Sequence, residues 1–419
     1  MLSYSRFFAT AADNALNFGL VLLIVDETGL AIMSSLLVLA LVVPSTVVGI
    51  LAGHAADTLP KRPLIFLGNL ARALICIWFV REGGGVLSFY VTAIALACAG
   101  EFVGAASGAL RPALVERDEL ARANALNQAI GSAAQFAGLA LLAPLVLRLF
   151  DSPQALFVIT ALMYVTAGVA AVLIGSQRRS QPESVGDAET PSGLLAGWRV
   201  LRSDPAISQA AIELTLISLT LIILGGLVPK FISDTLGLPV DVGAAILVPG
   251  ALGVALGLRV AGFLSHRVAH ALLSTIGFML FVVMLLALTF VNQEFSFLTG
   301  YALFAWLDNV NIGSFDGAGV LAVFIMAPLG FAFATVTVSG QTVLNDLVPL
   351  HLQGRVNATR GAIAALISTL PVLGAGLLAD LVGVTTVMAI VSALIGVAAL
   401  NNFRPSRTRV TPPALSESH

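Results

Sequence analysis

The sequence predicts an all-α membrane protein with twelve transmembrane helices, arranged as two parallel six-helix repeats. Three observations lead to this fold class. Hydrophobic residues make up 58% of the 419 residues and charged residues only 11%, whereas a soluble domain carries roughly 25% charged residues. Apolar stretches recur from end to end, most of them near the roughly 20 residues that a bilayer-spanning helix needs. The third observation is an internal repeat.

The repeat places the same unit in each half of the chain, in the same order. Ser107-Gly108 precedes Arg122-Ala123-Asn124-Ala125, and Ser339-Gly340 precedes Arg355-Val356-Asn357-Ala358. Ser339 lies 232 positions after Ser107, and Arg355 lies 233 positions after Arg122. In both copies an apolar segment ends at the Ser-Gly pair, and another begins after a short polar loop. A parallel repeat of about half the chain is typical of a two-lobed transporter.

The apolar segments justify each helix in turn. The first segment carries Asp13, Asn14 and Asn17 and lacks the short apolar core of a cleavable signal peptide, so we expect a retained helix. The remaining segments read as helices by length and hydropathy. The twelve predicted spans are 6–25, 31–56, 64–81, 86–110, 122–148, 154–175, 206–232, 241–264, 271–292, 317–345, 355–378 and 382–401.

Polar stretches divide the chain into domains. We expect an N-terminal six-helix lobe over 1–175, a linker over 176–205, a C-terminal six-helix lobe over 206–403 and a tail over 404–419. Within the linker, Gly193 to Arg202 has the pattern of a short amphipathic helix lying on the membrane surface.

The distribution of Lys and Arg predicts the orientation. With both termini and the linker in the cytoplasm, sixteen basic residues fall inside and three fall outside, namely Arg81, Arg148 and Lys230. We therefore expect a multi-pass protein of the plasma (inner) membrane with cytoplasmic termini and membrane lipids around it.

The second half of the chain contains an insertion. Gly262 lies 209 positions after Gly53, but the later Ser-Gly pairs are 232 positions apart. The extra 23 residues are best placed at 293–316, on the outer side. This segment is rich in Phe, Tyr and Trp, which favours an interfacial helix or a cap, although a variable loop without function remains the simpler interpretation.

The loop after the second span, Gly53-His54-Ala55-Ala56-Asp57-Thr58-Leu59-Pro60-Lys61-Arg62, resembles the signature loop of the major facilitator superfamily. Gly53, Asp57, Lys61 and Arg62 match that signature, and Thr58 stands where the family usually has Arg. The resemblance implies a conformational gate in which Asp57 pairs with Arg111 and meets the helix that begins near Arg355. This gate would hold the cytoplasmic side closed while the transporter opens outward.

Two branches of that superfamily are resembled. The segment 114–127 and Gly374-Ala375-Gly376-Leu377-Leu378-Ala379-Asp380 resemble the macrolide and siderophore exporters, and this resemblance covers more of the chain. Asp13-Asn14-Ala15-Leu16 resembles the lysophospholipid transporters instead. The first resemblance implies export of a small amphipathic or hydrophobic molecule, driven by protons.

Ionisable residues inside spans are the candidate coupling residues, because a charge in the bilayer interior is costly and needs a reason. Asp13 and Asn17 are four apart on one helix face, beside Asn14, so this polar face should point into the bundle. Asp13 is either a carrier of protons or cationic substrate, or a structural partner of Arg72. Glu101 is the second candidate carrier, unless it pairs with Arg72. Glu213 either lines the cavity, with Thr220 on the same face, or reaches toward water.

The sequence lacks the residue patterns that enzymes, nucleotide-binding proteins and metal-binding proteins need. No phosphate-binding glycine loop, metal-ligand cluster or group of catalytic side chains is present, so we expect neither an enzyme nor a cofactor or metal site. The net charge of −2 indicates no nucleic-acid partner. We expect a monomeric secondary transporter that works by alternating access. A lysophospholipid facilitator and a non-transporting receptor on the same fold remain the alternatives.

Overall fold

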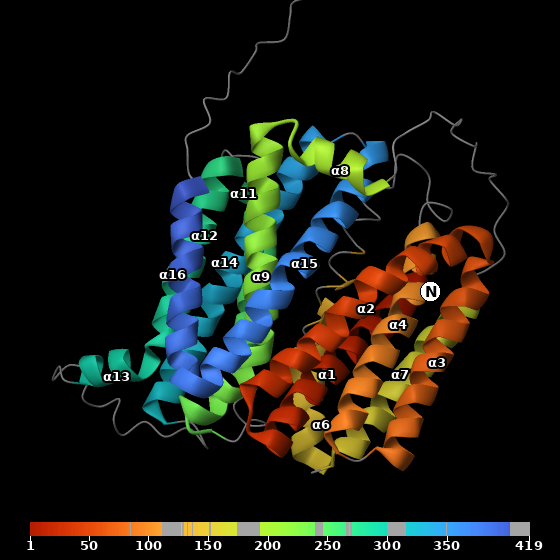
Figure 1. Ribbon diagram of the computed structural model, residues 1–419, viewed down its shortest axis with the longest axis horizontal. Helices are drawn as coiled ribbons and strands as arrows, with labels where there is room; N and C mark the ends of the chain where they lie inside the picture. The colour runs from red at the N-terminus through yellow and green to blue at the C-terminus, as the bar shows by residue number, and fades with distance from the viewer. Residues whose placement is uncertain are drawn as a thin grey trace, which may run out of the picture.

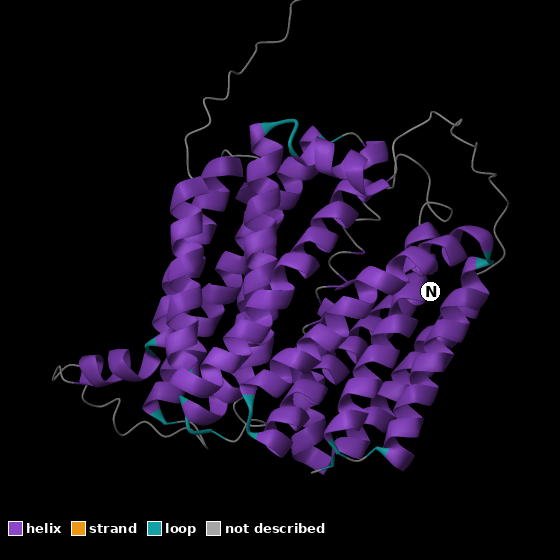
Figure 2. Ribbon diagram, in the orientation of Figure 1, coloured by secondary structure: helices purple, strands orange, loops and turns teal. Residues whose placement is uncertain are grey.

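The computed structural model confirms the predicted fold class, because its described part is built from helices joined by short loops (Figure 2). The structure describes residues 1–83, 85–110, 133–135, 137–150, 152–173, 193–238, 246–264, 270–299, 316–348 and 350–402, and the single positions 127, 130, 131 and 268. Ten of the described helices are long and apolar enough to cross a membrane, and two shorter apolar helices begin at Ala31 and Val384.

The N-terminal lobe contains the helices before the linker. Its first two helices are joined by only two residues, because Gly29 adopts a positive φ of 66° that ends α1 and turns the chain. The helices are α1 (Leu2–Thr28), α2 (Ala31–Thr58), α3 (Lys61–Glu82), α4 (Val86–Leu110), the π-helical turn η2 (Ala137–Leu142), α6 (Ala143–Phe150) and α7 (Pro153–Val172).

The second half of the chain contains the end of the linker, as α8, and the helices of the C-terminal lobe. Asp204 and Asp316 cap α9 and α14, since their carboxylates accept hydrogen bonds from Ala206 N at 2.7 Å and Gly319 N at 2.8 Å. The helices are α8 (Gly193–Leu201), α9 (Pro205–Asp234), α11 (Leu247–Leu264), α12 (His270–Thr289), α13 (Val291–Thr299), α14 (Gly317–Leu347), α15 (Leu350–Val382) and α16 (Val384–Asn402).

The helix bounds follow the predicted spans to within a few residues at most ends, and the following ends need correction. The ninth span ends at Thr289 and not at 292, because the chain turns there into the separate helix α13. The eleventh span is extended at both ends, over Leu350–Val382, and the first begins at Leu2. The first part of the predicted fifth span lies outside the described residues.

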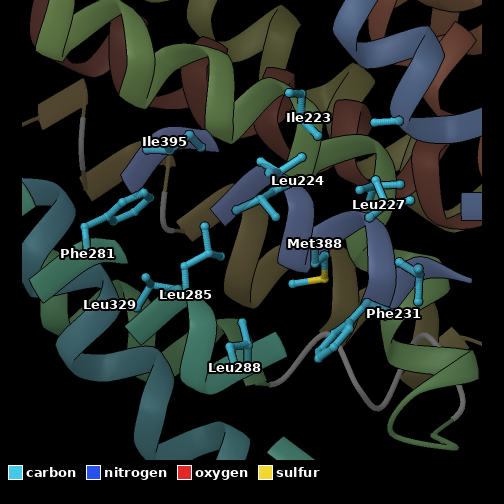
Figure 3. Close-up of a cluster of buried hydrophobic side chains, with 14 of the residues drawn as sticks. Ile223, Leu224, Leu227, Phe231, Phe281, Leu285, Leu288, Leu329, Met388 and Ile395 are labelled. Carbon is cyan, nitrogen blue, oxygen red and sulfur yellow. The ribbon is translucent and has the colours of Figure 1, made fainter. Parts of the chain in front are cut away.

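Each lobe has its own apolar core. In the N-terminal lobe Phe79 stacks on Phe157 with ring centroids 3.9 Å apart. The C-terminal core surrounds Leu227, Phe281 and Leu285, contributed by α9 and α12 (Figure 3). Helices α11 and α14 pack backbone to backbone, because a side chain on Gly330 would collide with the carbonyl of Gly250.

The two lobes meet at one end of the molecule. Their ribbons lie close together where α1 turns into α2, near the end that carries α13, and they diverge toward the opposite end, which carries α8 (Figure 1). We call these the α13 end and the α8 end. Across the boundary, α2 packs against both α9 and α15.

The two short helices lie across the bundle. Helix α13 opens the predicted insertion and projects sideways from the C-terminal lobe (Figure 1), with Phe297 65% exposed. Helix α13, the described part of this insertion, does not lie over the two lobes as a cap would (Figure 1). Helix α8 confirms the helix expected near 193–202, and Leu201 packs against α9 with Ile207 and Ala210.

Candidate functional site

Three helices of the N-terminal lobe bring one carboxylate, one guanidinium and one phenol together. Arg72 Nη1 on α3 lies 3.3 Å from Asp13 Oδ2 on α1. Tyr164 on α7 donates a hydrogen bond of 2.7 Å to Asp13 Oδ1. The guanidinium carbon of Arg72 also lies 5.3 Å from the centre of the Tyr164 ring, within cation–π range. We call Asp13, Arg72 and Tyr164 the polar triad.

Burial differs within the polar triad. The Arg72 side chain is 6% exposed and that of Asp13 is 33% exposed, while Tyr164 is fully buried. An arginine stays charged at all accessible pH values, so a buried Arg72 requires a carboxylate nearby. Asp13 is the member of the triad whose side chain remains partly exposed.

Small residues make room for the polar triad. A side chain on Gly100 of α4 would collide with Arg72 Nη2, so the guanidinium lies directly against that helix backbone. A side chain on Gly138 of η2 would collide with the carbonyl of Ala11 on α1. Gly100, the residue before Glu101, thus leaves the space that the Arg72 guanidinium occupies.

Further polar groups line α3 next to Arg72. Asn69 Nδ2 donates to the carbonyl of Ile65 at 2.9 Å, and Thr160 Oγ1 lies 4.0 Å from Cys76 Sγ. Within the described part of the chain, Asn69 Oδ1 and Arg72 Nε have no hydrogen-bond partner. The layer around the triad therefore has donor and acceptor capacity beyond the contacts that it makes.

Glu101 follows Gly100 on α4, the helix whose backbone the Arg72 guanidinium lies against. Among the described ion pairs Arg72 is joined to Asp13 and not to Glu101, although Arg72 and Glu101 interact electrostatically. The Glu101 side chain reaches α2, where a Cβ atom added to Gly49 would lie 3.6 Å from Glu101 Oε2. The carboxylates of Asp13 on α1 and Glu101 on α4 thus both interact with the Arg72 guanidinium.

The two predicted asparagines do not join the polar triad. Asn14 Nδ2 donates to the carbonyl of Thr10 in its own helix at 2.8 Å, and Asn14 faces η2 near Gly138. Asn17 is half-buried. The polar face predicted for the first span is therefore shared between the triad and η2.

Glu213 is buried in the C-terminal lobe, where it is only 4% exposed. It accepts a hydrogen bond of 3.0 Å from Gln209 Nε2 and another from Ser274 Oγ on α12. Thr220, expected to line a cavity with it, is fully buried and donates to the carbonyl of Leu216. The interpretation that Glu213 reaches toward water is wrong, because α12 covers it.

The described residues of the predicted gate lie at the α8 end. Asp57, in the last turn of α2, is exposed, and Gly53 is half-buried one turn earlier. Lys61 and Arg62 open α3. Arg111 and the side chain of Arg355 lie outside the described residues, so the pairing implied for Asp57 stays a prediction.

Sequence reasoning missed Tyr164 and a contact between the lobes. The position of Tyr164 in an apolar span could have indicated a polar contact, since a buried tyrosine hydroxyl usually finds a hydrogen-bond partner. At the α13 end, Asp380 on α15 accepts hydrogen bonds from Ala31 N and Ile32 N at the start of α2. Lys230 on α9 pairs with the same carboxylate. Lys230 was read only as an outer basic residue, and Asp380 only as part of a family-like segment.

Comparison with known proteins decides the family. The model of the Major Facilitator Superfamily matches residues 2–314. The chain belongs to this superfamily. A comparison with curated protein sequences found no match.

Solved structures agree with the major facilitator fold. The nucleoside transporter NupG has a TM-score of 0.69 at 14% identity, covering 96% of this chain and 97% of its own. A bacterial homolog of the human lysosomal transporter Spinster, in an inward-facing and unoccupied conformation, has a TM-score of 0.69 at 12% identity, covering 96% of this chain and 95% of its own. At these identities the similarity concerns the fold alone.

Proposed function

We propose that this major facilitator protein is a proton-coupled exporter of a small amphipathic or hydrophobic molecule, of the macrolide and siderophore exporter type. It works by alternating access as a monomer in the plasma (inner) membrane. The α8 end and both termini face the cytoplasm. The two lobes, 1–175 and 206–403, move against each other about the linker 176–205.

The observation that carries the proposal is the arrangement of Asp13 and Glu101 around Arg72. With both carboxylates ionised, these three side chains have a net charge of −1, and one bound proton makes them neutral. A low-dielectric interior favours the neutral form, and either carboxylate can take up that proton. The site is therefore suited to carry one proton per cycle, with Asp13 as the favoured carrier.

Proton binding can be coupled to helix movement through Arg72. While Asp13 is ionised, its ion pair with Arg72 and its hydrogen bond from Tyr164 tie α1 to α3 and α7. Protonation of Asp13 removes the charge that holds the guanidinium. Arg72 then needs Glu101 as its counter-ion, and the new pairing ties α3 to α4 instead.

The character of the spans supports an apolar or amphipathic substrate. Thr215, Thr335 and Thr337 donate their hydroxyls to backbone carbonyls of their own helices, at 2.7–2.9 Å. Because these three donors are already used, they are not available to recognise a polar substrate by hydrogen bonds.

A transport screen tests the proposal. Inverted vesicles that contain the protein are given dyes, macrolides, siderophores or lysophospholipids, with and without a proton gradient. We expect uptake of an amphipathic compound that depends on the gradient. Asp13→Asn should abolish this uptake, while Asp26→Asn, an exposed acid at the other end of the same helix, should retain it. Gradient-independent movement of lysophospholipids would favour the facilitator, and ligand binding without flux would favour the receptor.

A further inference from the structure

A carboxylate of the C-terminal lobe binds the first turn of a helix in the N-terminal lobe. Asp380 Oδ1 accepts a hydrogen bond from Ala31 N and Asp380 Oδ2 accepts one from Ile32 N, both at 2.9 Å. Lys230 Nζ lies 2.5 Å from Asp380 Oδ1 and donates to the carbonyl of Gly29 at 3.2 Å. Three hydrogen bonds therefore join the two lobes. Asp380 accepts two of them from the backbone, and Lys230 donates the third.

This contact satisfies groups that neither lobe satisfies alone. The N-cap residue of α2 is Leu30, which makes no side-chain cap hydrogen bond, so the free N–H groups of α2 are capped by Asp380 instead. Asp380 itself lies in the last turn of α15, where its charge is unfavourable to its own helix dipole but favourable to the N-terminus of α2. The side chains of Lys230 and Asp380 are only 12% and 14% exposed.

Small residues bring the three helices together beneath this contact. Ser34 Oγ donates to the carbonyl of Gly226 on α9 at 2.5 Å. A Cβ atom on Gly226 would lie 2.8 Å from Ser35 Oγ, and one on Gly376 of α15 would collide with the same hydroxyl. At this level the interface is formed by hydroxyls and backbone in close contact. Beside it, Leu39 of α2 is buried in the apolar cluster that contains Leu224 and Leu227 of α9.

Helices α2 and α15 each carry an acid in their last turn, and these two acids lie at opposite ends of the molecule. Helix α2 starts at the α13 end and α15 ends there, so the two run antiparallel (Figure 1). Asp57 lies in the last turn of α2 as Asp380 lies in the last turn of α15. In this structure Asp380 is engaged with the opposite helix, whereas Asp57 is exposed.

We propose that Asp380 and Lys230 form a lock between the lobes that alternates with the Asp57 gate. In the state seen here, Asp380 caps α2 and holds the α13 end closed. When the lobes move, this cap is lost, and Asp57 can meet the start of α15 at the α8 end. The relative strength of the two contacts sets the populations of the two states. The inference rests on the alternating access proposed above, but not on the substrate or on protons.

Electron–electron distance measurements in lipid nanodiscs test the lock without any substrate. One pair of spin labels, at Glu82→Cys and Gln293→Cys, reports on the α13 end, and another, at Leu59→Cys and Ser203→Cys, reports on the α8 end. The background is Cys76→Ala/Cys98→Ala. Asp380→Asn should increase the population with a long distance at the α13 end on the order of tenfold, because charge-assisted hydrogen bonds are lost. Lys230→Gln should act in the same direction.

Two controls make the test specific. Asp234→Asn removes an acid that lies 4.0 Å from the same Lys230 but within the same helix, and it should leave both distances unchanged. Asp57→Asn should shift the populations in the opposite direction, and Asp57→Asn/Asp380→Asn should lie near the unsubstituted protein. Unchanged distances in folded Asp380→Asn or Lys230→Gln protein overturn the lock. Shifted distances in a protein that moves none of the tested compounds support the lock and contradict the proposed export.

Discussion

Arg72 Nη1 lies 3.3 Å from Asp13 Oδ2, so the buried guanidinium of α3 has its observed ion pair with the first helix and not with Glu101 of α4. Of the two roles considered for Asp13, a carrier and a partner of Arg72, the second is seen directly. The two roles are compatible, since a carrier needs a counter-ion that it can release.

The first prediction concerns stability. If Glu101 can replace Asp13 as the counter-ion of Arg72, Asp13→Asn and Glu101→Gln should each cost only about 1 kcal/mol. The double variant should cost roughly 3–5 kcal/mol, because it leaves a buried charge uncompensated. Adding Arg72→Gln should restore much of the loss. Thermal melts of the purified protein measure this, and a double variant no worse than the sum of the singles would contradict the exchange of partners.

The second prediction separates coupling from binding. Asp13→Asn should abolish gradient-driven uptake into inverted vesicles but leave the exchange of substrate across the membrane intact, since exchange requires no net proton movement. Glu101→Gln should weaken the gradient dependence less. Full gradient-dependent transport in both single variants and in the double variant would exclude both residues as carriers.

Glu213 gives the third prediction. Its two donors, Gln209 and Ser274, are neutral, and a glutamine amide at this position can keep both contacts. Glu213→Gln should therefore retain gradient-driven transport, while Glu213→Leu should lower stability by about 1–3 kcal/mol because buried polar partners are left unsatisfied. Loss of gradient dependence in Glu213→Gln, with exchange intact, would instead make Glu213 the carrier.

The fourth prediction fixes the topology. The excess of basic residues on one side predicts that 293–316 is outside and 176–205 is inside. A membrane-impermeant thiol reagent added to intact cells should label Ser296→Cys and not Ser184→Cys, in a background without Cys76 and Cys98. The reverse pattern would invert the orientation, and with it the assignment of the α8 end to the cytoplasm.

The sequence predicted the helices well, and the reason is physical. The bilayer sets one length for every span, so apolar length alone located Val86–Leu110 without error. The errors are at helix ends that leave the membrane, such as Leu350, where hydropathy no longer marks the helix.

The candidate site was predictable only in part. The cost of a charge in a span identified Asp13, Arg72 and Glu101, and it suggested that Arg72 would pair with an acid. It could not show which acid, because that depends on how α1, α3 and α4 are rotated. Asp380 escaped notice for a different reason. An acid at the end of a span looks like an interface residue, and its role depends on the docking of two lobes.

The last prediction concerns Asp57. Because Asp57 is exposed in the present state, Asp57→Asn should change the stability of this state by no more than about 0.5 kcal/mol, as expected for a surface substitution. Its charge is needed in the other state, where the α8 end is closed, so its loss should slow transport strongly by shifting the balance between states. Crosslinking between the lobes at the α8 end should fall. Asp57→Glu, which keeps the charge, should retain part of the flux. Flux at the unsubstituted level in folded Asp57→Asn protein would remove the gate role.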